Sequence, residues 1–258
     1  MRGSVLLIGS LGLFALGVII SVFAPFADPT LKLPSARAHR YTGERLLGRR
    51  IYQREGCWYC HSQQVRDLPQ DRNSRPISEP GDYVYDRPHF LGTERTGPDL
   101  HNVGGRYPDQ WHVIHYGNPR AVNPGSVMPR FDYLSPKELR ALIAYVQRLR
   151  PAGVPHRLEP LDDTPAARLY ATACSHCHGR TGAADTHAAK MMDPPPPRLD
   201  DANLMARRSD DDLTRVINNG VPATGMIPWR TTVNAREMPD LIRFLRTLPT
   251  RPKREAVR

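Results

Sequence analysis

Two short motifs carry the residues of this chain that could do chemistry. Residues 57–61 (CWYCH) and 174–178 (CSHCH) each place two thiols three positions apart, with a histidine directly after the second thiol. This pattern is typical of covalent haem c attachment, in which both thiols bond to one porphyrin and the histidine ligates its iron. The sequence therefore predicts two covalently bound haems c, with His61 and His178 as proximal ligands. The thiols are those of Cys57, Cys60, Cys174 and Cys177.

Other uses of these cysteines fit less well. The chain has 4 cysteines, and all lie in the two motifs, so none is left for a structural disulfide. A four-cysteine zinc site would place its pairs about 15–20 residues apart, whereas 114 positions separate Cys60 from Cys174. A thioredoxin-like dithiol needs a βαβ setting, which the sequence pattern lacks.

A second axial ligand is expected downstream of each motif. Residues 118–129 (NPRAVNPGSVMP) resemble the methionine loop of class I cytochromes c, which makes Met128 the ligand of the first iron. In the second half the candidate is Met226, with Met191 and Met192 as nearer alternatives. Histidine–methionine ligation raises the reduction potential and fills both axial positions, so we expect no catalytic site in this chain.

The resemblance to cytochromes c also implies an acceptor for each proximal histidine. In those proteins a proline carbonyl accepts a hydrogen bond from the other ring nitrogen, and this contact fixes the orientation of the ring. Residues 96–100 (TGPDL) have this form, which indicates Pro98 for His61. Pro197 is the equivalent for His178, with the prolines at 194–196 as alternatives.

Several further residues are candidates for the haem surroundings. Trp111, His112 and His115 are expected on a helix before the methionine loop, and His115 could donate to the methionine sulfur, replace it as ligand, or be an ordinary half-buried histidine. Arg106 and Arg120 could pair with haem propionates or simply face water. His176 is expected to be a solvated spacer between its cysteines. These residues are read directly from the sequence.

The two halves repeat one plan, which predicts mainly α-helical domains. Apolar residues at 139, 142, 143, 145, 146 and 149 recur 99 positions later with the spacing of an amphipathic helix. Ser135 with Glu138 forms a capping box before the first copy, and Asn234 with Glu237 repeats it before the second. Thr164 followed by proline is expected to open the helix that leads to the second motif.

The amino terminus predicts a membrane anchor. Residues 5–26 are almost entirely apolar and without charge, which is about one bilayer crossing as a helix. A cleaved signal peptide is the alternative, but its apolar region is usually about 7–15 residues, and Pro25 and Phe26 before Ala27 make a poor cleavage site.

The charges flanking this segment do not agree on its orientation. Arg2 favours a cytoplasmic start, whereas Lys32, Arg37 and Arg40 favour the reverse. Because bacteria attach haem c outside the cytoplasm, we expect a single-pass protein of the inner membrane with its haem domains in the periplasm.

We therefore expect an N-terminal transmembrane helix followed by two cytochrome c-like domains. The predicted segments are an anchor at 1–28, a linker at 29–41, domain 1 at 42–150, a proline-containing linker at 151–163, domain 2 at 164–249 and a basic tail at 250–258. The net charge of +10 raises the possibility of nucleic-acid binding, but much of it lies at the two ends and no basic stripe with interleaved aromatics occurs.

Many residues of the first half are not required by haem binding alone. They lie at 48–52, 55–66, 85–88, 95–100, 103–107, 109–112, 115, 119–120 and 128–129. Over about residues 46–134 the chain resembles subunit II of cbb3-type cytochrome c oxidases. In that family the subunit is a single-helix, monohaem cytochrome that ends near residue 150, so residues 164–249 are expected to form an additional class I-like domain.

The resemblance implies an electron-transfer subunit of a cbb3-like haem–copper oxidase. The haem of His178 and Met226 would accept electrons from a soluble cytochrome or a quinol-oxidising complex, and the haem of His61 and Met128 would pass them to the catalytic subunit. The alternatives are a membrane-tethered dihaem shuttle and a subunit of another respiratory complex, such as a nitric oxide reductase or dehydrogenase. A dihaem peroxidase would need one open iron, which two methionine candidates argue against.

Overall fold

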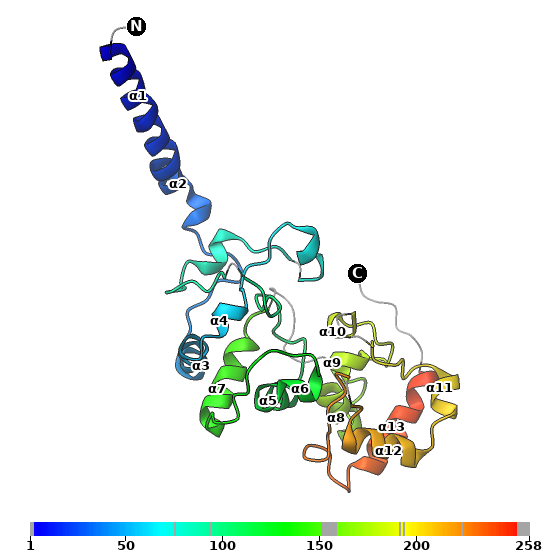
Figure 1. Ribbon diagram of the computed structural model, residues 1–258. Helices are drawn as coiled ribbons and strands as arrows, with labels where there is room; N and C mark the ends of the chain where they lie inside the picture. Colours follow the sequence, from blue (N-terminus) through cyan, green and yellow to red (C-terminus); the bar gives the residue numbers. More distant parts are fainter. Residues whose placement is uncertain are drawn as a thin grey trace.

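The computed structural model describes residues 3–74, 76–92, 94–150, 159–190, 192, 194–222 and 224–251, and this part of the chain is helical with no strand (Figure 1). The predicted mainly α fold is thus confirmed. Residues 151–158 of the predicted linker, residues 252–258 of the basic tail and the alternative ligand Met191 lie outside the described residues.

An apolar helix of 25 residues, Gly3–Ala27, stands apart from the rest of the molecule (Figure 1). It comprises α1 (Gly3–Val18), a π-helical turn (Ile19–Phe23) and α2 (Ala24–Ala27). At 1.5 Å per residue it reaches about 37 Å, enough for a hydrocarbon core of about 30 Å. Its most apolar window has a mean hydropathy of 2.6 and no residue buried against the protein, which fits a membrane anchor.

A buried ionic cluster fastens the segment after the anchor to the first half of the chain. Arg37 donates to Asp82 at 2.7 Å and to the side-chain oxygen of Asn102 at 2.9 Å. The Asp82 carboxylate also accepts from Ser35 at 2.5 Å and lies 3.0 Å from a ring nitrogen of His101. The Asp82 side chain is 1 % exposed, so these contacts replace its hydration.

The first hydrophobic core forms around two helices that cross closely. α3 (Gly43–Arg54) packs against α7 (Pro136–Val146), where a Cβ at Gly48 would lie 1.8 Å from the Ala141 carbonyl oxygen. Ser135 and Glu138 form the predicted capping box at the start of α7. Along the chain, α3 and α7 are separated by α4 (Cys57–Cys60), two 3-10 turns (Pro69–Ser74 and Pro80–Tyr83), α5 (Asp109–Gly117) and α6 (Pro119–Val122).

The second half has its own core, built from α8 (Pro165–Ala173), α12 (Asp210–Asn219) and α13 (Met238–Thr247). The short helices α9 (Ser175–His178), α10 (His187–Lys190) and α11 (Ala202–Ala206) and a 3-10 turn (Leu248–Thr250) complete it. Thr164 caps α8 as predicted, by accepting from the Ala167 amide.

One predicted helix start differs from the structure. Asn234 and Glu237 do make the reciprocal contacts of a capping box, but they close a turn, and α13 begins at Met238.

The repeat has a structural counterpart in one aromatic pair per half. The ring of Tyr52 lies 5.4 Å from that of Tyr145, and the ring of Tyr170 lies 5.2 Å from that of Phe244, which is 99 positions after Tyr145. Each pair joins the helix before a cysteine motif to the last helix of its half.

The Asp82 cluster predicts an acid-sensitive step in stability. Burial alone would raise the pKa of Asp82, but hydrogen bonds from His101 and Ser35 hold it well below the usual value of 3.8. Because the folded-state pKa is lower than the unfolded one, ionised Asp82 stabilises the fold above about pH 4, and this contribution is lost as the pH falls. We expect Asp82→Asn to unfold about 3 kcal/mol more easily at pH 7 and to lose part of the acid dependence in denaturant titrations. The exposed Asp132, changed to Asn, is the control, and parallel pH curves for wild type and Asp82→Asn would contradict the prediction.

Candidate functional site

The first cysteine motif forms a single helical turn, and a glycine in the left-handed conformation precedes it. Gly56 follows α3 in the left-handed region, with φ of +69°, and a Cβ there would lie 2.8 Å from the Tyr59 ring. The turn of α4 then brings the His61 amide 2.9 Å from the carbonyl oxygen of Cys57. The backbone thus places the two thiols of the motif on one turn, directly followed by the imidazole.

The ring of His61 is held by the loop that contains Pro98. Its Nδ1 lies 2.8 Å from the Pro98 carbonyl oxygen, and because a carbonyl accepts only, Nδ1 carries the proton and Nε2 is left as a lone-pair donor. Burial lowers the pKa of His61, which keeps the ring neutral. A Cβ at Gly97 would lie 2.3 Å from the Cε1 atom of His61, so the loop can approach this closely only with glycine there.

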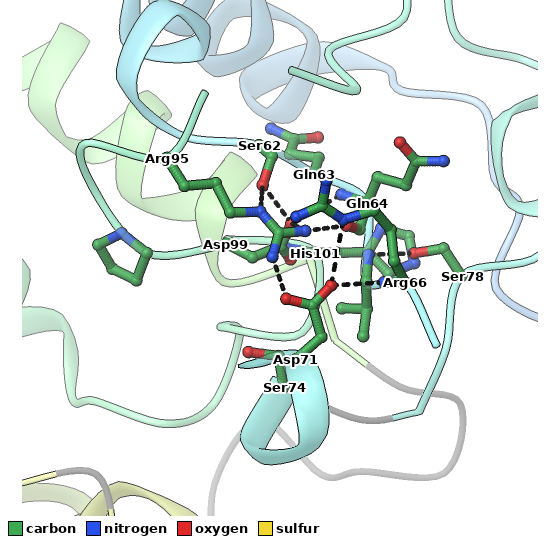
Figure 2. A network of polar contacts seen from close by, with 12 residues as sticks. Ser62, Gln63, Gln64, Arg66, Asp71, Ser74, Ser78, Arg95, Asp99 and His101 are labelled. Atoms are coloured by element: carbon green, nitrogen blue, oxygen red, sulfur yellow. Dashed lines mark hydrogen bonds and ion pairs between the residues drawn. The ribbon is translucent and has the colours of Figure 1, made fainter. Parts of the chain in front are cut away.

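A buried polar network locks the Pro98 loop to the strand-like segment after His61 (Figure 2). The Asp99 carboxylate accepts from the Ser62 hydroxyl at 2.6 Å and from the Gln64 amide at 2.8 Å. Two backbone bonds join the same segments, from Gly97 to the Cys60 carbonyl at 2.9 Å and from Leu100 to the Ser62 carbonyl at 2.8 Å.

Arg95 closes this network. Its guanidinium donates to the Ser62 hydroxyl at 2.6 Å and to the carboxylate of Asp71 (Figure 2). Asp71 is 2 % exposed; burial alone would raise its pKa, but hydrogen bonds from Arg95 and Arg66 hold it below the usual value. The pattern of residue types did not predict Arg95 or Asp71 as site residues, although Arg95 and Asp99 fall in the stretch that carries the family resemblance.

On the other side of the first site, α5 presents polar atoms that have no hydrogen-bond partner. The Nε1 atom of Trp111 and the Nδ1 atom of His115 are both buried without a partner among the described residues. Burial lowers the pKa of His115 to about 4, and repulsion from His61 contributes whenever that ring is protonated. Both atoms lie on the helix predicted for them, and each could bond to a polar group that the described residues do not supply.

The two candidate arginines occupy different surroundings. Arg106 is half-buried, has no acidic ion-pair partner among the described residues, and its pKa is lowered by burial. A carboxylate such as a haem propionate would add to the electrostatic stabilisation that Asp99 gives this cation. Arg120 is exposed and donates to the Met128 carbonyl at 3.3 Å, where it steadies the methionine loop.

Met128 follows α6 in a loop that is tied to the core. Its side chain is partly buried against the first hydrophobic core, and its amide donates to the Ser126 hydroxyl at 3.2 Å. Beyond it, the Phe131 amide donates to the Tyr116 carbonyl at 2.8 Å, which returns the loop to α5. Taken with the neutral His61 ring, the unpartnered donors of α5 and the Arg106 cation, the residues of the first half fit a covalently attached haem.

The second motif repeats the proximal arrangement. The His178 amide lies 3.0 Å from the Cys174 carbonyl oxygen, and the Nδ1 atom of His178 lies 3.1 Å from the carbonyl oxygen of Pro197. The prolines at 194–196 make no such contact with His178 in the structure. Tyr170 donates to the Gly179 carbonyl at 2.7 Å, as Tyr52 does to the His61 carbonyl at 3.4 Å.

Two methionines meet at the second site. Met226 is partly buried against the second core, and its carbonyl accepts from the Val221 amide at 2.9 Å. A Cβ at the neighbouring Gly225 would lie 2.9 Å from the sulfur of Met192. The side chain of the alternative ligand Met192 thus lies beside Gly225, the residue before Met226.

The surroundings of three of the four cysteines disfavour the ionised thiolate. Burial raises the pKa values of Cys57, Cys174 and Cys177 to about 12, and metal ligation requires thiolates. All four cysteines are free thiols, and among the described residues no three His, Cys, Asp or Glu side chains gather into a metal site.

One known family matches almost the whole chain. Its model, described as "Cytochrome C oxidase, mono-heme subunit/FixO", matches residues 2–249. The match is wider than the resemblance at 46–134 and includes the second motif. A search of curated proteins found no match.

The close approach of the Pro98 loop predicts that Gly97 is sensitive to substitution. In Gly97→Ala the added methyl would overlap the His61 ring, so the ring must move away from the Pro98 carbonyl. We expect a loss of about 1–3 kcal/mol in unfolding free energy and a shift in the reduction potential measured by redox titration. Gly117→Ala, where a Cβ meets no atom within 4 Å, is the matched control. Equal potentials for the two variants would refute the proposed role of the contact.

The pairing of methionines predicts different effects of two substitutions. Met226→Ala should abolish the methionine–iron charge-transfer band of one ferric haem, because Met226 is the predicted ligand. Met192→Ala should leave both bands. Loss of a band in Met192→Ala instead would make Met192 the ligand of the second iron.

Proposed function

The chain belongs to the family of mono-haem cytochrome c oxidase subunits named FixO, and from this premise we propose that it is a dihaem electron-transfer subunit of a cbb3-type oxidase. Membership supports a cytochrome c subunit of the oxidase, and the apolar helix Gly3–Ala27 fits its attachment to the membrane. The second haem is the part of the proposal that goes beyond the family description.

The observation that carries the second haem is the repeated contact between imidazole and proline carbonyl. His61 and His178 each follow a pair of cysteines, and the Nδ1 atoms lie 2.8 and 3.1 Å from the carbonyl oxygens of Pro98 and Pro197. A surface histidine with no ligand to hold would gain little from this restraint, whereas a metal-ligating histidine needs its second nitrogen held.

Each haem, when bound, would supply a one-electron carrier whose potential depends on its axial ligands. The protein's contribution is to attach and orient it. Cys57, Cys60, Cys174 and Cys177 would form the thioether bonds, and His61 and His178 would ligate iron through Nε2. Met128 and Met226 would take the opposite axial positions and close both sites to substrate.

The position of the anchor indicates how far each attachment site would lie from the membrane. The ionic cluster of Arg37 and Asp82 fastens the first half directly behind the anchor, so the first motif would stay near the membrane and near a haem–copper catalytic subunit. The second motif lies in the half farther from the anchor (Figure 1) and would meet a periplasmic donor, either a soluble cytochrome or a quinol-oxidising complex.

A haem count tests the proposal directly. We expect the pyridine haemochrome spectrum of the full chain, purified in mild detergent, to give two haems c per chain. The double variant Cys174→Ser, Cys177→Ser should give one, and so should its counterpart Cys57→Ser, Cys60→Ser. A single haem c in the wild type would show that one motif is not loaded.

The partner is tested in the same preparation. Co-purifying haem b, with oxygen uptake from reduced cytochrome, is expected for an oxidase subunit. Two haems c without haem b, under conditions that keep respiratory complexes intact, would favour a separate shuttle.

A further inference from the structure

Helix α5 of the first half belongs to both hydrophobic cores. Trp111 and Ile114 pack against the core of the second half, and Val122 of α6 is a buried member of it. Tyr107 and Tyr116, by contrast, lie with the first core. Figure 1 shows α5 and α6 next to α8 and α9. The two halves are therefore docked through one short helical segment rather than joined by a linker alone.

The second cysteine motif faces this junction. A cavity of about 150 Å³ lies between the halves, lined on one side by Asp109 and Gln147 and on the other by Thr172, Ala173 and His176. His176 is 5 % exposed, so the expectation of a solvated spacer is wrong, because the first half covers it. Gln147 positions the start of α5 by donating to the Tyr107 carbonyl at 2.9 Å and to Asp109 at 2.8 Å.

Three aromatic rings are stacked along this segment. The ring centroids of Tyr107 and Trp111 are 4.0 Å apart with planes 15° from parallel, and those of Trp111 and His115 are 4.5 Å apart at 20°. Trp111 and His115 are four residues apart on α5 and therefore lie on the same face of the helix. Tyr107 precedes the helix and stacks on Trp111 from its start. Both distances are those of van der Waals contact between stacked rings.

The two ends of this column point to different motifs. His115 is followed by Tyr116, a buried member of the first core, against which Cys57 and Met128 are also packed. Tyr107 leads into Pro108 and Asp109, which line the same cavity as His176 of the second motif. The column thus begins beside the second attachment motif and ends beside the first.

We propose that the stacked rings of Tyr107, Trp111 and His115 couple the two attachment sites and carry the route by which an electron passes between them. The inference rests on the proposed function, because it requires a haem at each motif. One electron crosses per event: one iron is oxidised from the ferrous to the ferric state, the other is reduced, and no bond or proton need change.

The geometry gives a physical reason for this role. Trp111 and His115 keep a fixed spacing on α5, and Tyr107 stacks on Trp111 just before the helix, so the three rings form one continuous series of contacts at the junction. Trp111 is the central ring, with one neighbour in each direction, and its Nε1 atom is buried without a partner. It contacts the second core and both outer rings.

The experiment compares two substitutions on the same docking face of the full-length dihaem protein in detergent. Trp111→Leu removes the ring, whereas Ile114→Ala weakens the apolar contact with the second core but leaves the rings. After pulsed reduction we would follow the redistribution of the electron between the haems, with small-angle scattering to check that the halves stay docked. Trp111→Phe, which keeps a stackable ring, is the conservative variant if Trp111→Leu proves unstable.

We expect Trp111→Leu to slow the redistribution about tenfold or more through loss of both stacking contacts, with Trp111→Phe and Ile114→Ala close to the wild type. Equal rates in Trp111→Leu and wild type, with two haems present and the halves docked, would overturn the proposal. Equal slowing in Trp111→Leu and Ile114→Ala would also overturn it, because docking alone would then explain the effect. A wild type with one haem would instead refute the proposed dihaem function.

Discussion

The contact between His61 and the Pro98 carbonyl is the constraint on which the first half depends. A histidine can ligate iron through Nε2 only if its other nitrogen is protonated and its ring is held, and a carbonyl oxygen at 2.8 Å achieves both. The loop that supplies this oxygen has no regular secondary structure of its own, so its position depends on two backbone hydrogen bonds to the segment of Cys60 and Ser62 and on side chains. Asp99, Arg95 and Asp71 form the network that holds it, and Gly97 allows it to approach.

The desolvation of the buried charged groups explains why each of them has hydrogen-bond partners. Buried carboxylates and a nearly buried guanidinium lose their hydration, and each must recover it from partners within the protein. Asp71 and Asp99 do so through Arg95, through hydroxyl groups and through backbone amides. The second half reaches the same His–Pro geometry at 3.1 Å.

The docking of the halves makes the two motifs unequal. In the first motif Cys60 and Tyr59 are exposed. In the second motif Ser175 and His176 are buried, and α5 of the first half lies across the junction. The two motifs therefore repeat in sequence but differ in their surroundings. The second motif faces the first half of the chain, whereas the first motif is partly exposed.

The sequence by itself determined the features that depend on local spacing. The two cysteine motifs, the apolar anchor, the capping box of Ser135 and the helix opened by Thr164 all follow from residues a few positions apart, because a helical turn or a cap is closed by near neighbours. Only the tertiary structure decided which proline carbonyl contacts His178, that α13 begins at Met238, that Arg95 and Asp71 belong to the first site, and that His176 is buried. Each of these depends on contacts between segments that are distant in sequence. Packing sets those contacts, and a local sequence pattern does not predict them.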